Sequence, residues 1–447
     1  MSGRRSIVIV GGGASDVILA LHLLQLPLPD LRVTVVEKRP SFGRGLAYST
    51  TLRDHLLNVS AEGMSAYADD PEHFRRWLAK RGLGRPPDTP YYAPRGTYGD
   101  YLEELITTLE KEEPARLRLV RGEAASITPT ASGVEVLLAN GASLVARTAV
   151  LAVGHDELPA PSMRFAIRMG SAEDTPLDPS APVLILGTGL SMVDAWLSLE
   201  AGGHRGAIIA VSRRGLLPWP HRPGRPMRLD SADIPLGTEL SYFVDWFRDL
   251  VHETKQSGGD WRDVVDGLRP FNQRIWQSWP ASAKRRFLNH TKAWWDIHRH
   301  RMAPDIHARM RDALRTDRLT VLAARILAVR EEEGTLAIDI QHRQSRAVET
   351  LRVARVYDCT GIAKNLEEGS LAIVRSLIER GLARADPFKL GLDVTRECAV
   401  IDSDGAASDK LFAVGPLTRG TFFEIDAVPD IRVQCKALAQ RLASEVL

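Results

Sequence analysis

A run of three glycines near the start of the chain is the first feature with a readable chemistry. It lies in IVIVGGGASDVILALHLL, residues 7–24, between a β-branched run and an apolar stretch with helical spacing. Gly11 permits a tight turn, and Gly13 lets the backbone approach a pyrophosphate at a helix N-terminus. Glu37 ends the next strand-like run, where a carboxylate accepts ribose hydroxyls. The pattern predicts a dinucleotide site with contacts from Gly11, Gly13, Ala14, Ser15, Glu37 and Lys38. The alternative is a tight turn followed by a solvated glutamate.

Asp16 occupies the position where such a turn usually has its third glycine. A helix N-terminus favours an acid by about 0.3–1 kcal/mol, but that benefit competes with the pyrophosphate for the same dipole. Three explanations remain open: a rearranged turn, a weakened affinity for the cofactor, or an introduced substitution. We expect that the turn still binds the pyrophosphate and that the acid reduces its affinity.

A second glycine turn follows in VLILGTGLSMVDAWLSL, residues 183–199, with Gly187 and Gly189 between a strand-like run and a helical pattern. The next strand-like run ends in Ser212, Arg213 and Arg214 instead of an acid. A terminal acid repels a 2′-phosphate, whereas arginines bind it. We therefore predict NADPH rather than NADH at this second site. An exposed basic turn is the alternative.

Aromatic and basic side chains are concentrated in AWWDIHRHRMAP, where helical spacing places some of them on one face. One interpretation is a wall over the nicotinamide, with His300 or Arg301 holding an acidic group of the substrate or cofactor. The other is an aromatic core stripe with a basic helix end. Arg419 and Glu424 flank a Gly–Thr–Phe–Phe turn and are our preferred substrate-recognition pair, with arginine for a carboxylate and glutamate for an ammonium group. An internal Arg–Glu ion pair competes with that interpretation, and no other catalytic residue is assigned.

The order of strand-like and helical patterns predicts an α/β fold with two Rossmann-like dinucleotide-binding domains. The second is expected to be inserted in the first, together with an additional helical, Trp-rich segment. The predicted boundaries are 1–160 and 363–447 for the two parts of the first domain, 180–238 and 317–362 for the second domain, and 239–316 for the helical insert.

Composition narrows the class of protein further. The 447 residues include 58 basic and 56 acidic side chains, and a formal net charge of +2 argues against a nucleic-acid partner. The three cysteines, Cys359, Cys398 and Cys435, are far apart, so we expect no disulfide, no redox pair and no metal site. No apolar run reaches the roughly 20 residues of a membrane span, and no signal pattern is present. We expect a cytoplasmic protein without a membrane partner; the sequence gives no prediction of oligomeric state.

Several motifs in order resemble the bacterial FAD/NAD(P)-binding family, a distant relative of flavin-dependent amine N-hydroxylases and Baeyer–Villiger monooxygenases. The motifs are GRGLAYST (43–50), HLLNVSAEGMSA (55–66), APRGTYGDYL (93–102), VLAVGH (150–155), GTGLSMVD (187–194), SRRGLLPWPH (212–221), HRHRMAP (298–304) and VGPLTRGTFFE (414–424). The sequence departs from these relatives at Asp16, at DCTGI, and in lacking the Baeyer–Villiger signature.

This resemblance implies FAD in the outer domain and NADPH in the inserted one. It also implies flavin-ring contacts from Asn58 and Ser65, a crossing between the domains at Gly154, and a second flavin contact at Gly415. The expected function is an NADPH-dependent FAD monooxygenase that uses molecular oxygen on a small-molecule substrate, with N-hydroxylation of an amine or amino acid implied by the resemblance. The alternatives are an NAD(P)H:FAD oxidoreductase with another acceptor, and a degenerate flavoprotein-fold binding protein.

Overall fold

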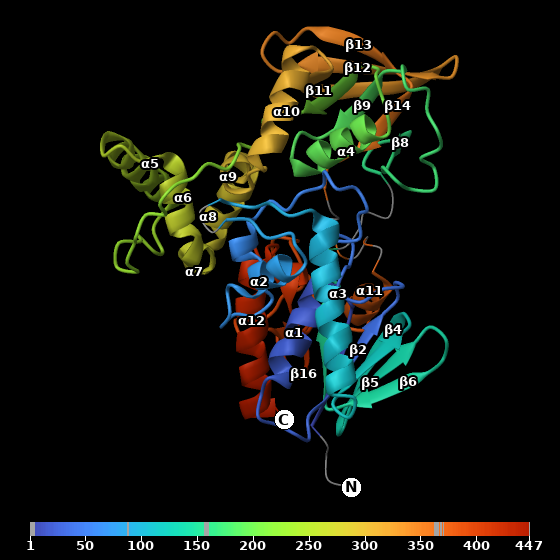
Figure 1. Ribbon diagram of the computed structural model, residues 1–447, viewed down its shortest axis with the longest axis vertical. Coiled ribbons are helices and arrows are strands. Elements are labelled where there is room, and N and C mark those ends of the chain that lie inside the picture. Colours follow the sequence, from blue (N-terminus) through green and yellow to red (C-terminus); the bar gives the residue numbers. More distant parts are fainter. Residues whose placement is uncertain are drawn as a thin grey trace.

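The computed structural model describes residues 5–86, 89–155, 161–361, 366, 369 and 371–446. Figure 1 shows two lobes joined by several chain segments, with a group of helices, α5–α9, projecting to one side. The first lobe contains both the beginning and the end of the described chain. No helix of the described residues is long and apolar enough to cross a membrane.

The first lobe is built on a six-stranded sheet with the order β15-β16-β7-β1-β2-β3. All neighbours are parallel except β15 and β16, and β7 pairs with both β1 and β16. The β-branched runs form strands buried by helices, as a parallel sheet requires. The strands are β1 (Ser6–Val10), β2 (Arg32–Glu37), β3 (Leu117–Arg121), β7 (Thr148–Leu151), β15 (Ala399–Ile401) and β16 (Ala407–Ala413).

Helices cover this sheet, and α1 lies between α3 and α12 (Figure 1). The helix α1 ends at Leu24, shortly before Pro27, which cannot continue a helix. A small antiparallel sheet of β4, β5 and β6 packs against α11. The bounds are α1 (Ala14–Leu24), α2 (His73–Lys80), α3 (Arg95–Glu112), α11 (Ala372–Glu379), α12 (Val428–Arg441), β4 (Ala124–Thr130), β5 (Gly133–Leu138) and β6 (Ser143–Ala146).

The second lobe has a seven-stranded sheet with the order β13-β12-β11-β10-β9-β14-β8. The strands from β11 to β8 are parallel, and β12 and β13 extend the sheet as an antiparallel hairpin. Every strand of this sheet lies in the chain between β7 and β15, which confirms the predicted insertion of one Rossmann-like domain in another. The strands are β8 (Ala166–Ile167), β9 (Val183–Leu186), β10 (Ile208–Ser212), β11 (Leu319–Glu332), β12 (Thr335–His342), β13 (Val348–Val353) and β14 (Arg355–Asp358).

Two elements lie outside the predicted boundaries of the second domain. The strand β8 pairs with β14 and so joins the second sheet before residue 180. The helix α10 (Pro304–Arg315) buries Ile306 and Met310 in the same core as α4 (Leu190–Ala201), although the sequence assigns it to the helical insert. Apolar burial therefore places α10 with the second lobe. The boundaries predicted at residues 160 and 363 lie outside the described residues.

The remaining helices form the insert, which has an aromatic core. Trp276 stacks on Phe423 of the first lobe, with ring centroids 4.7 Å apart, and its indole N–H donates to the carbonyl oxygen of Gly420. In sequence, the insert lies between strands of the second lobe, but in space it packs against the first lobe. Its helices are α5 (Leu240–Gln256), α6 (Trp261–Leu268), α7 (Asn272–Ser278), α8 (Ala281–Arg286) and α9 (Lys292–Arg299).

Candidate functional site

The first glycine turn joins β1 to α1 and needs glycine at two positions. Gly11 has a φ of +116°, and a Cβ atom there would lie 2.8 Å from the carbonyl oxygen of Ala152. A Cβ atom on Gly12 would overlap the side chain of Glu37. The two glycines therefore let the turn pack directly against Ala152 and Glu37, and the turn lines a cavity beside Glu37.

A cavity crosses the first sheet at the carboxyl ends of its strands. It begins at Glu37, passes the glycine turn, and reaches His155 and Asp426 at its other end. Of the predicted cofactor contacts, seven line this cavity: Gly11, Gly13, Ala14, Ser15, Glu37, Lys38 and Gly154. Gly415 does not line it, but its neighbour Pro416 does. The structure therefore brings most of the predicted first site together in one cavity.

Asp16 caps the helix that this turn begins. Its Oδ2 atom accepts a hydrogen bond of 2.7 Å from the backbone N–H of Gly13, and the side chain is fully buried. Its Oδ1 atom is buried without a hydrogen-bond partner among the described residues. Burial, together with the nearby Glu37 carboxylate, raises the pKa of Asp16 well above its usual value. A carboxyl group that resists ionisation therefore lies directly behind the turn.

The turn itself is not rearranged by Asp16. Gly13 has φ −86° and ψ −157°, and Gly189 of the second turn has φ −85° and ψ −167°. Gly11 and Gly187 have φ values of +116° and +101°. The second turn has Met192 where the first has Asp16, yet both turns have the same backbone conformation. Of the three explanations for Asp16, the structure disfavours the rearranged turn.

The second glycine turn joins β9 to α4, and its basic neighbours gather beside it. Thr188 donates to the carbonyl oxygen of Leu216 at 2.6 Å and bonds the Ser212 hydroxyl at 2.9 Å, which holds the loop after β10 against the turn. The structure places Gly187, Gly189, Ser212, Arg213 and Arg214 around this point. These positions fit the predicted nucleotide turn.

Arg343 is a residue that the sequence did not indicate. It follows β12 in the β12–β13 hairpin, and its guanidinium donates to the carbonyl oxygen of Arg213 at 3.2 Å. The two residues are 130 positions apart. A third arginine therefore lies beside Arg213 and Arg214, and only the pairing of β10 with β11 and of β11 with β12 brings it there.

Neither of the two residues predicted to contact the flavin ring, Ser65 and Asn58, lines the cavity. Ser65 is buried, and its hydroxyl donates to the carbonyl oxygen of Asp70 at 2.6 Å and accepts from the N–H of Tyr67 at 3.1 Å. These bonds hold its own loop, and Ser65 does not line the cavity. Ser65 thus has a structural role in its own loop, and its predicted flavin contact stays a prediction. Asn58 does not line the cavity either; its carbonyl oxygen is bonded by His221 of the second lobe.

Glu424 is a buried ion-pair partner of the helical insert. It accepts hydrogen bonds from Asn272 Nδ2 at 2.6 Å, from Arg299 Nε at 3.0 Å, and from the indole N–H of Trp295. Burial opposes its ionisation, but Arg299 and His300 outweigh this cost and lower the pKa of Glu424. Three protein donors leave little capacity for a substrate ammonium group.

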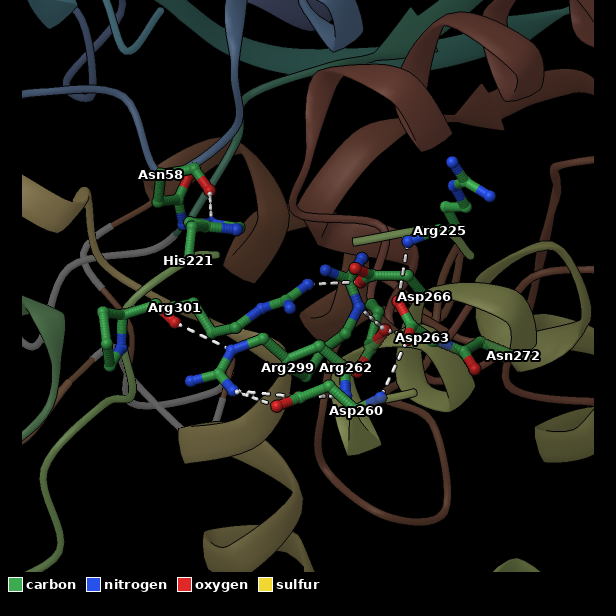
Figure 2. A network of polar contacts seen from close by, with 12 residues as sticks. Asn58, His221, Arg225, Asp260, Arg262, Asp263, Asp266, Asn272, Arg299 and Arg301 are labelled. Carbon is green, nitrogen blue, oxygen red and sulfur yellow. Dashed lines mark hydrogen bonds and ion pairs between the residues drawn. The ribbon is translucent and has the colours of Figure 1, made fainter. Parts of the chain in front are cut away.

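Arg419 and Glu424 therefore do not act as a pair. Arg419 donates to the carbonyl oxygen of Pro416 at 3.2 Å, and its Nε lies 3.8 Å from Asp426 Oδ1. The alternative, an internal Arg419–Glu424 ion pair, is not formed, because each residue has a different partner, and the substrate-recognition role stays a prediction. Arg301 is buried and pairs with Asp266 (Figure 2). His300 is half-buried, and burial lowers its pKa.

His221 and Arg95 connect the two lobes. Because the Asn58 carbonyl only accepts, His221 Nε2 donates to it, at 2.9 Å (Figure 2). The ring of His221 packs on Tyr92 with centroids 5.1 Å apart, and burial lowers its pKa to about 4. Arg95 at the start of α3 donates two hydrogen bonds, of 2.7 and 3.2 Å, to the carboxylate of Asp194 on α4. These contacts fix the position of the second lobe relative to the first.

Comparison with known proteins agrees with this geometry. Residues 8–156 match a protein-family model described as FAD-NAD(P)-binding. This match confirms the predicted resemblance for the first third of the chain. No curated protein matches the sequence.

Solved structures match the fold over nearly the whole chain. An ornithine N-hydroxylase from Kutzneria sp. 744, solved with reduced FAD, NADP⁺ and L-ornithine, has 15% identity and a TM-score of 0.65, covering 98% of this chain and 99% of that one. A cadaverine monooxygenase from Erwinia amylovora, solved with FAD, has 14% identity and a TM-score of 0.66, covering 98% and 94%. An L-lysine 6-monooxygenase from Pseudomonas syringae has 18% identity and a TM-score of 0.62, covering 99% of both chains. This likeness confirms the predicted fold class.

Proposed function

We propose that the chain is an FAD-dependent monooxygenase that uses NADPH and hydroxylates the nitrogen of a small amine. The observation that carries this proposal is the presence of two different nucleotide sites in one chain. One is a glycine-lined cavity that begins at an acid, and the other is a glycine turn beside the strand that precedes Arg213 and Arg214, with Arg343 bonded to the Arg213 carbonyl. The amine substrate is supported by the whole-length likeness to hydroxylases of ornithine, lysine and cadaverine.

The residues of the first cavity fit FAD. Glu37 ends β2 with its carboxylate facing the turn, in the position where an acid accepts ribose hydroxyls. The N-terminus of α1, with the amides of Ala14 and Ser15, suits the pyrophosphate. Because Gly12 has no side chain, the turn packs directly against Glu37, and both line the same cavity.

The second turn fits NADPH. Gly187 and Gly189 leave the N-terminus of α4 open to a pyrophosphate, and a Cβ atom on Gly187 would lie 2.6 Å from the carbonyl oxygen of Cys359. Arg213 and Arg214 follow the strand at which an NADH-binding protein would place an acid. The local charge therefore favours a ligand with a 2′-phosphate.

FAD, when bound, supplies the redox chemistry, since it accepts a hydride from NADPH and in its reduced form reacts with oxygen. The protein must hold the two nucleotides in a fixed position relative to each other and shield the reacting groups from water. The bond from His221 to Asn58 and the Arg95–Asp194 pair perform the first task across the lobes. With a pKa of about 4, His221 is neutral near pH 7 and keeps its single donor on Asn58.

The proposed reaction is tested with the purified protein, FAD and NADPH in oxygenated buffer. Ornithine, lysine and cadaverine are supplied separately, and N-hydroxylated product and hydrogen peroxide are measured together. Amine-dependent formation of a hydroxylamine supports the proposal. NADPH oxidation with no oxygenated product from any amine would favour an NAD(P)H:FAD oxidoreductase with a different acceptor.

A further inference from the structure

We propose that His155 and Asp426 form a donor–acceptor pair that positions the flavin half of FAD at the far end of the cavity. This inference rests on the proposed use of FAD. Neither residue was indicated as a cofactor contact by the sequence.

Strand order gives the cavity a direction. The neighbours β2, β1, β7 and β16 lie side by side in the first sheet. Glu37 ends β2, the glycine turn follows β1, His155 comes shortly after β7, and Pro416 comes shortly after β16. From β2 to β16 is three strand spacings, roughly 14 Å, a span suited to an extended dinucleotide. With the adenosine ribose at Glu37 and the pyrophosphate at the turn, the flavin half lies over β7 and β16.

His155 and Asp426 are the polar pair in that part of the cavity wall. His155 Nε2 lies 3.5 Å from Asp426 Oδ1, and the two side chains are 34% and 33% exposed. This separation is longer than a well-formed hydrogen bond. Both groups therefore retain capacity to bind a polar ligand atom. Arg419, whose Nε lies 3.8 Å from the same carboxylate oxygen, helps to hold Asp426 in place.

The two groups offer complementary chemistry. His155 Nδ1 is buried with no hydrogen-bond partner among the described residues, so the ring proton belongs on Nε2, facing the carboxylate. Burial lowers the pKa of His155, which favours the neutral ring. The cavity wall thus presents one N–H donor beside one carboxylate acceptor. A hydroxyl of the ribityl chain or the imide edge of the flavin matches such a pair, whereas a phosphate would be repelled by Asp426.

The test compares the binding of FAD with that of ADP, which lacks the flavin half. Both ligands are titrated calorimetrically into the wild-type protein and into His155→Ala, His155→Gln and Asp426→Asn. The glutamine side chain in His155→Gln would place an amide donor near the original Nε2 position. His342→Ala is the control, because His342 pairs with Glu349 on the exposed hairpin of the second sheet.

We expect His155→Ala and Asp426→Asn to weaken FAD binding about tenfold, the effect of losing one hydrogen bond at a half-buried site, and to leave ADP binding within twofold. His155→Gln should recover most of the FAD affinity, and His342→Ala should match the wild type. Equal weakening of FAD and ADP, including in His155→Gln, would assign these residues a structural role and overturn the inference. Unchanged FAD binding in all variants would overturn it as well. A wild-type protein that binds ADP but not FAD would instead contradict the proposed function.

Discussion

The carboxylate of Asp16 accepts a 2.7 Å hydrogen bond from the backbone N–H of Gly13, the residue that caps α1. The helix thereby uses its own side chain to occupy one donor of the turn that would bind a pyrophosphate. The second carboxylate oxygen is buried with no partner among the described residues, and Glu37 is close enough to oppose ionisation. The protein folds the turn normally and buries behind it a carboxyl group whose ionisation is opposed.

Replacement of Asp16 should therefore strengthen FAD binding. Both Asp16→Asn and Asp16→Gly remove the buried acid, and Asp16→Gly also restores the usual third glycine. At pH 8, where ionisation of the buried carboxyl is most favoured, we expect a five- to tenfold lower dissociation constant, since the ionised form places about 1 kcal/mol of unfavourable charge near the phosphates. Fluorescence quenching of FAD measures the change. Equal affinities of wild type and both variants would show that the acid does not influence the site.

The same residue should make the stability of the ligand-free protein depend on pH. The folded state raises the pKa of Asp16, so it holds the proton more tightly than the unfolded chain does. The stabilisation that Asp16 gains by holding this proton is fully present below the pKa of the unfolded chain, near 3.8. It is lost as the pH rises through the higher pKa of the folded state. Asp16→Asn should thus gain in melting temperature relative to wild type as the pH increases from 4 to 8. A constant difference over that range would contradict the assignment.

Arg343 should contribute to the choice between NADPH and NADH. Its guanidinium lies against the Arg213 carbonyl, beside the two arginines expected to bind the 2′-phosphate. We expect Arg343→Ala and Arg213→Ala each to weaken NADPH binding about tenfold, as the loss of a charged hydrogen bond does, with little effect on NADH. Arg346→Ala, in the same exposed hairpin, is the matched control. An equal loss of affinity for NADPH and NADH would show that Arg343 supports the hairpin and does not bind the 2′-phosphate.

The buried Arg299–Glu424 pair should be essential for the stability of the insert. Their side chains are 8% and 6% exposed, so removal of one charge leaves the other without compensation. Glu424→Gln should reduce the free energy of unfolding by about 3–5 kcal/mol in urea titrations. Asp430→Asn, which breaks the more exposed pair with Arg269, should cost less. A smaller loss for Glu424→Gln than for Asp430→Asn would contradict this account.

Local features of the site were predictable, and long-range contacts were not. The glycine turns, Glu37 and the strand ends follow from patterns within about thirty residues, and the structure places them as expected. Asp16 also had a local signal, because an acid three residues after the helix cap is typical of a capping box. The partners of Glu424 and Arg343 lie 125 and 130 positions away, respectively, and no sequence pattern joins them.

Ser65 shows that a short motif does not determine which partner a serine hydroxyl bonds. Its motif predicted a flavin contact, but a serine hydroxyl bonds equally well to nearby backbone groups. In the folded loop it does so with Tyr67 and Asp70. Which of these partners a serine selects depends on the path of the chain around it, which the motif does not specify.

The central claim is that this chain carries FAD and NADPH in the two sites described. The most direct test is the visible spectrum of the purified protein after addition of FAD and removal of free ligand, followed by anaerobic NADPH. We expect a bound flavin spectrum that bleaches when NADPH is added. A protein that is colourless after incubation with excess FAD and removal of the free ligand would contradict the claim and would favour a degenerate binding protein with the same fold.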